Sequence, residues 1–171
     1  MAVGIIAESI FNAKLRYGIA VYFKPRLSEE DESCKFQEPL QVLQNDMLRE
    51  LFGHKRADKV NMDRLRKHQN MLSVNQLACY HILIETFNIL NNNSSPQIEQ
   101  KIRHRENPRY NMRSNEKGEL HIIDRPLKSC TGFTYIAGKI WNMLPEEVRR
   151  IPEADPFKLK IKAWIEESIP S

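Results

Sequence analysis

The sequence lacks the features that mark membrane, secreted and zinc-binding proteins. No apolar run approaches the roughly 20 residues that cross a bilayer, and no basic segment or cleavage site frames the apolar residues 3–11. The cysteines are odd in number and far apart, which argues against a disulfide framework and against paired zinc ligands; they are Cys34, Cys79 and Cys130. We therefore expect an intracellular protein, in the nucleus or the cytoplasm, that contacts no membrane and holds no metal and no cofactor.

Catalytic motifs are absent as well. Synthesis of a polynucleotide needs carboxylates that converge on two metal ions, but the acidic pairs at 29–30, 146–147 and 166–167 fall in predicted loops or at helix ends. The glycines in the stretch 132–139 have the wrong spacing for a phosphate-binding loop. We predict that the chain is not an enzyme, and we assign no catalytic residue.

The composition is that of a globular chain that buries a core. Hydrophobic residues make up 41% of the 171 positions and charged residues 28%. This length accommodates one compact unit or two small ones. The net charge of +4 is mild, so the distribution of charge along the chain is more informative than its sum.

Charge is segregated along the chain. Residues 28–38 are acidic, whereas two later stretches are rich in lysine and arginine. The candidate nucleic-acid contacts in these two stretches are Lys55, Arg56, Lys59, Arg64, Arg66, Lys67, Lys101, Arg103, Arg105, Arg109, Tyr110 and Arg113. Cationic side chains bind phosphates, and an aromatic ring between two arginines can stack on a base. The alternative, that these stretches are ordinary solvated faces, stays open at this point.

The first half of the chain predicts helices. Residues 3–24 are apolar on more than one side and end at Pro25. Pro39 suits the first turn of a second helix, and Gly53 is placed to end it. We interpret the apolar stripe of this helix as core rather than as a binding groove; it consists of Leu40, Leu43, Met47, Leu48 and Leu51.

Two capping patterns follow. Asn61 is placed to cap a short helix. Ser73, with Gln76 three residues later, forms a capping box that opens a longer helix, which reaches about Leu90. Because this helix is apolar nearly all round, we expect it to be central to the core.

The remainder of the chain is less regular at first and then helical again. Periodicity fades from about residue 103 to residue 117, and residues 120–123 form a short β-prone run. Thr131 is placed to cap a helix that carries Trp141 as a core anchor. A last helix is expected to begin at Asp155 and Pro156 and to turn four side chains inward, namely Phe157, Ile161, Trp164 and Ile165. The predicted fold is mostly α, an irregular helical bundle with at most one short β-hairpin or edge strand.

Five segments carry short motifs in a fixed order. They are residues 15–19 (LRYGI), 40–49 (LQVLQNDMLR), 71–74 (MLSV), 109–113 (RYNMR) and a longer run over 133–149 that continues with Phe157, Lys158 and Lys162. The longer run holds Phe133, Tyr135, Gly138, Trp141 and Asn142, followed by LPEEVR at 144–149. In this order the motifs resemble the C-terminal, thumb-like and tail part of reverse transcriptases encoded by non-LTR retrotransposons of the jockey-like and chicken-repeat-like groups. Met112 departs from the threonine that is usual in the fourth motif.

The resemblance implies a truncated reverse transcriptase, an RNA-directed DNA polymerase fragment without catalysis of its own. The parent enzyme copies RNA into DNA at a genomic target, and its palm, with an aromatic-x-Asp-Asp turn, would lie upstream. The implied partners are RNA or DNA, bound through the basic segments, and either the missing palm or a second copy of the chain, bound through residues 3–24. The chain would divide into a thumb-like helical region (1–93), a basic loop or linker (94–118) and a C-terminal helical tail (119–171).

Two other classes of function stay open. The chain fits a host-used helical protein-interaction module that kept the fold without binding nucleic acid. It also fits a relic open reading frame with no nucleic-acid role.

Overall fold

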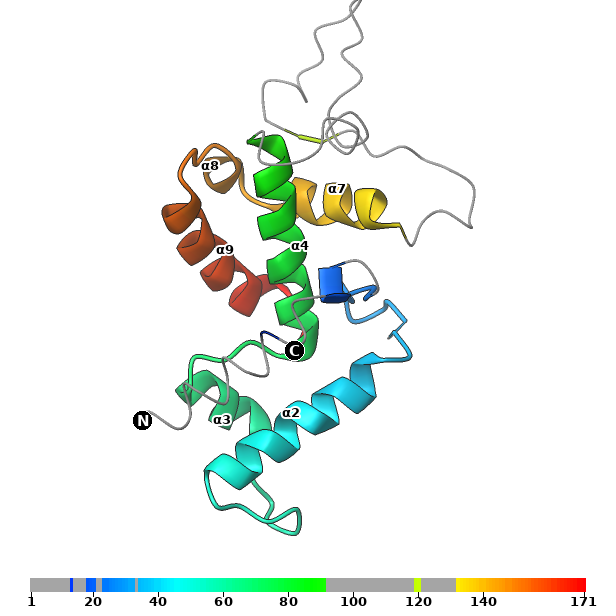
Figure 1. The fold of residues 1–171 in the computed structure, drawn as a ribbon, viewed down its shortest axis with the longest axis vertical. Helices are drawn as coiled ribbons and strands as arrows, with labels where there is room; N and C mark the ends of the chain where they lie inside the picture. The colour runs from blue at the N-terminus through cyan, green and yellow to red at the C-terminus, as the bar shows by residue number, and fades with distance from the viewer. Residues whose placement is uncertain (1–12, 14–17, 21–22, 33, 92–118, 121–131) are drawn as a thin grey trace, which may run out of the picture. The chain divides into compact units, whose positions relative to one another are not determined.

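The computed structural model is mostly helical, and the residues that it describes contain no strand (Figure 1). These residues are 13, 18–20, 23–32, 34–91, 119–120 and 132–171. The helices are α2 (Gln37–Leu51), α3 (Met62–His68), α4 (Val74–Leu90), α7 (Phe133–Met143), α8 (Glu146–Arg149) and α9 (Ala154–Ser168). The predicted mostly α fold, an irregular helical bundle, is confirmed.

The chain forms two compact units, one made of residues 1–78 and 168–171 and the other of residues 79–167. The division into 1–93, 94–118 and 119–171 stays a prediction, because all of 94–118 lies outside the described residues. Most of the helix expected over residues 3–24 also lies outside them, although residues 18–20 are helical.

Local chemistry sets the bounds of α2 and α3 in the first unit. Pro39 occupies the first turn of α2, as predicted. Gly53, with φ at +69°, follows the C-cap, and the backbone N–H of His54 donates to the carbonyl of Arg49 at 2.8 Å. This is the Schellman arrangement, in which glycine takes the left-handed conformation at little cost. The Asn61 side chain accepts from the backbone N–H of Arg64 at 3.0 Å, so its predicted cap is confirmed.

A small apolar core and a set of buried amides hold the first unit together. Ile19, Phe23, Val74 and Ala78 form the core, and Cys34, Leu40 and Met47 pack against it. Gln44 is fully buried, and its Nε2 donates to the carbonyl of Leu72 at 2.9 Å. Asn75 exchanges two hydrogen bonds with the backbone of Arg26 and donates another to the carbonyl of Pro170. Because a buried amide without a partner is costly, these bonds fix α2 and the C-terminal residues of this unit.

The apolar stripe of α2 is only partly buried. Leu48 is buried, but Leu43 is 57% exposed, and Leu40 and Met47 are half-buried. The prediction that the whole stripe faces the core is therefore wrong for Leu43. The helix is rotated so that Gln44 faces inward, where its amide has a carbonyl partner. The periodicity of apolar residues in the sequence cannot predict that a polar amide such as Gln44 will be buried.

Helix α4 begins and ends where the sequence predicts. The backbone N–H of Ser73 donates to Gln76 Oε1 at 3.1 Å, and the N–H of Gln76 donates to Ser73 Oγ at 3.3 Å, which confirms the capping box. The helix ends at Leu90, and Glu85 is the one exposed residue within it. Its expected central place in the core is confirmed by this burial.

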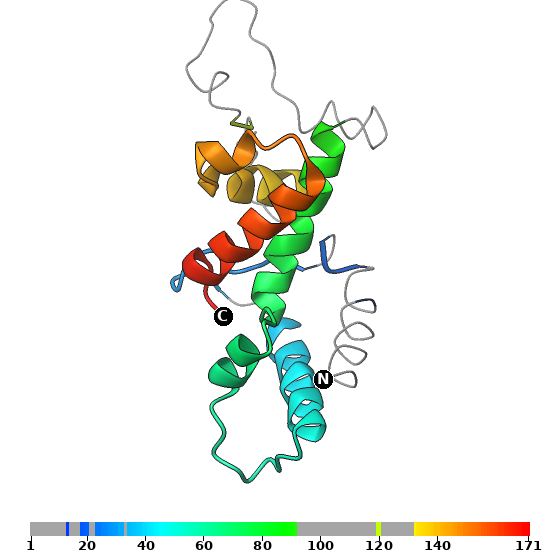
Figure 2. The same cartoon turned by 90° about the vertical axis from the view of Figure 1, so that its left-hand side faces the viewer.

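Aromatic side chains lie at the centre of the core of the second unit. Phe157 of α9 stacks on Phe87 of α4 with ring centroids 4.4 Å apart, and its centroid lies 5.8 Å from that of Trp141. Figure 2 shows α9 passing alongside α4. Trp141 is buried, as predicted for a core anchor, and so are Phe157, Ile161 and Ile165. Trp164, also predicted to face inward, is only half-buried.

The starts of α7 and α9 differ from the predictions. Gly132 is the N-cap of α7 and makes no side-chain cap, whereas Thr131 lies outside the described residues. Helix α9 begins at Ala154, so Asp155 and Pro156 stand within its first turn rather than at its boundary. The Asp155 carboxylate accepts from Lys158 Nζ at 2.9 Å, and this side-chain bond lowers the pKa of Asp155. Of the predicted β-prone run, Leu120 is described and is not in a strand, while residues 121–123 lie outside the described part.

Candidate nucleic-acid interface

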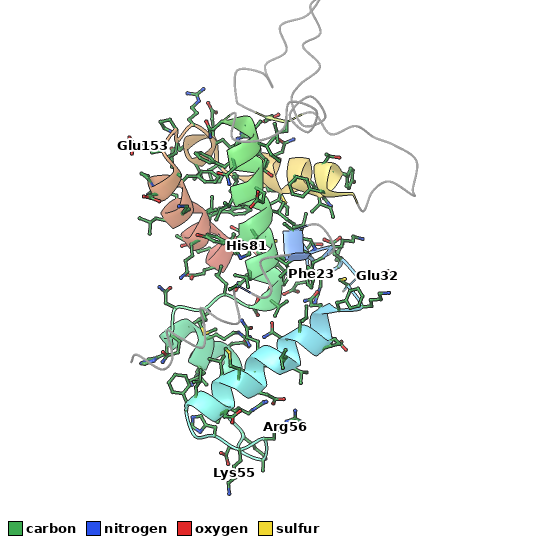
Figure 3. The ribbon with its side chains drawn as sticks, in the orientation of Figure 1. Phe23, Glu32, Lys55, Arg56, His81 and Glu153 are labelled. Atoms are coloured by element: carbon green, nitrogen blue, oxygen red, sulfur yellow. The ribbon has the colours of Figure 1, made fainter. Side chains whose placement is uncertain are left out.

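The connection between α2 and α3 is held by two carboxylates. Asp58 Oδ2 accepts from the backbone N–H of Lys55 at 2.6 Å and closes a turn. Asp46, on α2, accepts from Arg56 Nε at 3.0 Å and from Arg56 Nη2, and it also pairs with Arg49 Nη1 at 3.0 Å. Figure 3 shows Lys55 and Arg56 together in this connection. These contacts fix the basic connection against α2.

The Asp46–Arg56 pair has a clear electrostatic signature. The hydrogen bond from Arg56 lowers the pKa of Asp46, and Arg49 lowers it further. The same hydrogen bond raises the pKa of Arg56. Both groups are therefore charged near neutral pH, and Asp46 offsets part of the positive charge that Arg56 presents to solvent.

Arg66 is a buried anchor rather than an exposed cation, and its assignment as a phosphate contact stays a prediction. Its side chain is buried, and its Nη1 donates to Asn45 Oδ1 at 2.7 Å while Nη2 pairs with Asp63. Burial lowers the pKa of Arg66, and Asp63 opposes this shift. An arginine side chain can be buried when its N–H groups find hydrogen-bond acceptors. The sequence pattern does not indicate which arginine of a basic stretch will be buried in this way.

The remaining cations of the first basic stretch are open to solvent. Lys55, Lys59, Arg64 and Lys67 are exposed, and within the described residues their side chains make no ion pair and no hydrogen bond. Together with Arg56 they form what we call the basic surface: Lys55, Arg56, Lys59, Arg64 and Lys67. Arg56 is paired with Asp46, whereas the other four cations have no partner among the described residues. Exposed cations of this kind attract polyanions and can contact several phosphates.

One turn of α2 positions both halves of the basic surface. Asp46 holds Arg56 of the connection, and the neighbouring Asn45 holds Arg66 of α3. Neither Asp46 nor Asn45 is among the site residues predicted from the sequence. The only local signal for Asp46 is its spacing of three residues from Arg49, with which it pairs. No comparable signal marks Asn45.

The second predicted basic stretch is not described by the structure. Lys101, Arg103, Arg105, Arg109, Tyr110 and Arg113 all lie within residues 92–118, outside the described residues. Their assignment as nucleic-acid contacts stays a prediction.

Other kinds of site find no support in the described part of the chain. No group of three His, Cys, Asp or Glu side chains there is placed to hold a metal ion. Cys34 and Cys79 are free thiols, and burial raises the pKa of Cys79, so it does not form a nucleophilic thiolate. None of the described helices combines the length and the apolar character that a membrane span requires.

No family model, curated protein sequence or solved structure matches the chain.

Proposed function

We propose that the chain is a non-catalytic helical fragment of a retrotransposon reverse transcriptase, and that its basic surface binds the phosphate backbone of RNA or DNA. The observation that carries the binding proposal is a set of four exposed cations, Lys55, Lys59, Arg64 and Lys67, that have no partner in the described part of the chain and lie in one connection and the helix that follows it. The order of the five sequence motifs supports the assignment to a reverse transcriptase. An intracellular location, in the nucleus or the cytoplasm, is part of this proposal.

The mode of binding follows from the chemistry of these side chains. Lysine and arginine neutralise phosphates and release the counterions condensed on them, which favours binding without reading the base sequence. Arg66 and Asp46 do not touch the ligand on this account. They hold α3 and the α2–α3 connection in place, so that the exposed cations face one polyanion rather than moving independently.

Charge reversal with a matched control tests the proposal. Lys59→Glu combined with Lys67→Glu removes two cations of the basic surface. Lys139→Glu combined with Lys160→Glu makes the same change of charge at two other exposed lysines, on α7 and α9. Binding of labelled single-stranded RNA, single-stranded DNA and duplex DNA is measured by fluorescence anisotropy.

We expect the first pair of substitutions to weaken binding of all three ligands and to reduce the steepness of the log–log salt dependence by about 1.4–1.8. The control pair should leave that steepness unchanged. Equal losses in the two double variants would assign the effect to net charge and contradict the proposed surface. Absence of binding by the unaltered protein at low salt would favour the protein-interaction module or the relic.

A further inference from the structure

Helix α2 presents an apolar strip that the first unit leaves partly uncovered. Phe36 is 50% exposed and Leu43 is 57% exposed. Leu40 and Met47 share this side of the helix by their spacing of three and four residues; they pack against the core of this unit and are half-buried, so each is only partly open to solvent. The strip runs for about 16 Å along α2, taking 1.5 Å per residue. Two large apolar side chains exposed on the same side of one helix can be covered by a second apolar surface.

The two ends of this strip carry opposite charge. Glu29, Glu30 and Glu32 are exposed in the segment before α2, and Lys55 and Arg56 are exposed in the connection that follows it. Figure 3 shows Glu32 near the N-terminal end of α2 and Lys55 in the connection beyond its C-terminal end, while Arg56 of the same connection reaches back toward Asp46 within α2. At the flanks of the helix, Lys35 is exposed at the beginning and Glu50 near the end.

When two copies of α2 lie antiparallel, the acidic end of one helix meets the basic end of the other. We propose that α2 of one chain pairs antiparallel with α2 of a second copy, across a two-fold axis near Leu43. The apolar strips then cover each other, and the acidic end of each copy faces the basic end of the other. Lys35 of each copy lies near Glu50 of the second copy. A parallel pairing would instead place like charges together.

The proposed dimer is independent of nucleic-acid binding, because it forms without nucleic acid. We expect it to be weak. A single helical strip buries less than the roughly 1,600 Å² of a standard interface. We therefore expect a dissociation constant of the dimer between about 1 µM and about 1 mM. The proposed dimer surface on α2 is distinct from residues 3–24, the segment predicted above to bind the missing palm or a second copy.

Two neighbouring residues of α2 provide a matched test by sedimentation velocity without nucleic acid. Leu43→Glu places a charge on the strip. Val42→Glu places the same charge at a residue that is 50% exposed but about 100° away around the helix. We expect the unaltered chain and the Val42→Glu variant to dimerise alike, and the Leu43→Glu variant to stay monomeric over the whole concentration range. Circular dichroism of each variant checks that the helices are retained.

A charge swap tests the orientation. Lys35→Glu alone and Glu50→Lys alone should each weaken the dimer, and the two together should restore it, because each copy again presents opposite charges to the other. A monomer throughout the range, a Leu43→Glu variant that dimerises normally, equal losses from both glutamate variants, or additive losses in the double charge variant would overturn the proposal.

Discussion

The side-chain amide of Asn142 satisfies both backbone polar groups of Leu120. Asn142 Oδ1 accepts from the N–H of Leu120 at 2.7 Å, and Nδ2 donates to its carbonyl at 2.7 Å. The amide thus replaces the backbone of a neighbouring strand for a buried residue that lies 22 positions away in the chain. Arg149 Nη2 lies 3.8 Å from Glu119 Oε1 and adds a second tie to the same segment. Residues 119–120 are therefore fastened to α7 and α8 of the second unit.

Asn142→Ala should destabilise the second unit by about 1–3 kcal/mol, because it leaves the N–H and the carbonyl of Leu120 without partners. Denaturant unfolding followed by circular dichroism measures this change. The neighbouring residue supplies the control: Met143 is exposed, and Met143→Ala should change the free energy of unfolding by no more than about 0.5 kcal/mol. An Asn142→Ala variant as stable as the Met143→Ala variant would show that the amide clamp contributes nothing.

Phe157→Ala should cost about 3–5 kcal/mol, since it removes a fully buried ring from its contacts with Phe87 and Trp141. Leu159→Ala, two residues along α9 at a side chain that is 74% exposed, should lie within about 0.5 kcal/mol of the unaltered protein. Thermal and denaturant unfolding of both variants compare the two sites. Similar losses at both positions would mean that α9 packs with a different face than described.

Arg66 and Lys67 are adjacent on α3 and should respond in opposite ways. Arg66→Ala removes the bonds to Asn45 and Asp63, so the free energy of unfolding should fall by about 1–3 kcal/mol. Lys67→Ala should leave stability within about 0.5 kcal/mol and weaken RNA and DNA binding instead. Unfolding and anisotropy measured on the same two proteins separate the roles. A stable Arg66→Ala variant with weakened binding would return Arg66 to the basic surface.

Local signals in the sequence predicted local structure well. The Ser73–Gln76 capping box, the Asn61 cap and the glycine stop at Gly53 involve neighbours in the chain, and each is confirmed. Errors arose where a distant partner decides the outcome. Leu43 is exposed because the Gln44 amide finds a carbonyl 28 residues away, and Arg66 is buried because Asn45 accepts its hydrogen bond 21 residues away. Apolar periodicity and charge runs carry no information about such partners. The basic stretch was therefore predicted, but the distinction between its buried residue, Arg66, and its exposed cations was not.

The Asp46–Arg56 contact predicts a pH dependence of the α2–α3 connection. Because the folded-state pKa of Asp46 is lowered from its ordinary value of 3.8, the contact stabilises the fold above that pH and is lost as the pH falls through the lower folded value. NMR titration of the Asp46 carboxyl carbon should give a midpoint below 3.8. Arg56→Gln should move this midpoint upward, toward the ordinary value. A midpoint at or above 3.8 in the unaltered protein would rule out the pairing in solution.

Binding of the nucleic-acid backbone by the basic surface should be visible in the salt dependence of affinity. Anisotropy titrations of single-stranded RNA, single-stranded DNA and duplex DNA of unrelated sequences, repeated across a series of salt concentrations, give the log–log slope of affinity against salt. Four or five phosphate contacts from Lys55, Arg56, Lys59, Arg64 and Lys67 predict a slope of about −3 to −4.5, with little difference between sequences. No binding at low salt with micromolar protein, or a slope near zero, would show that the basic surface does not bind nucleic-acid backbone.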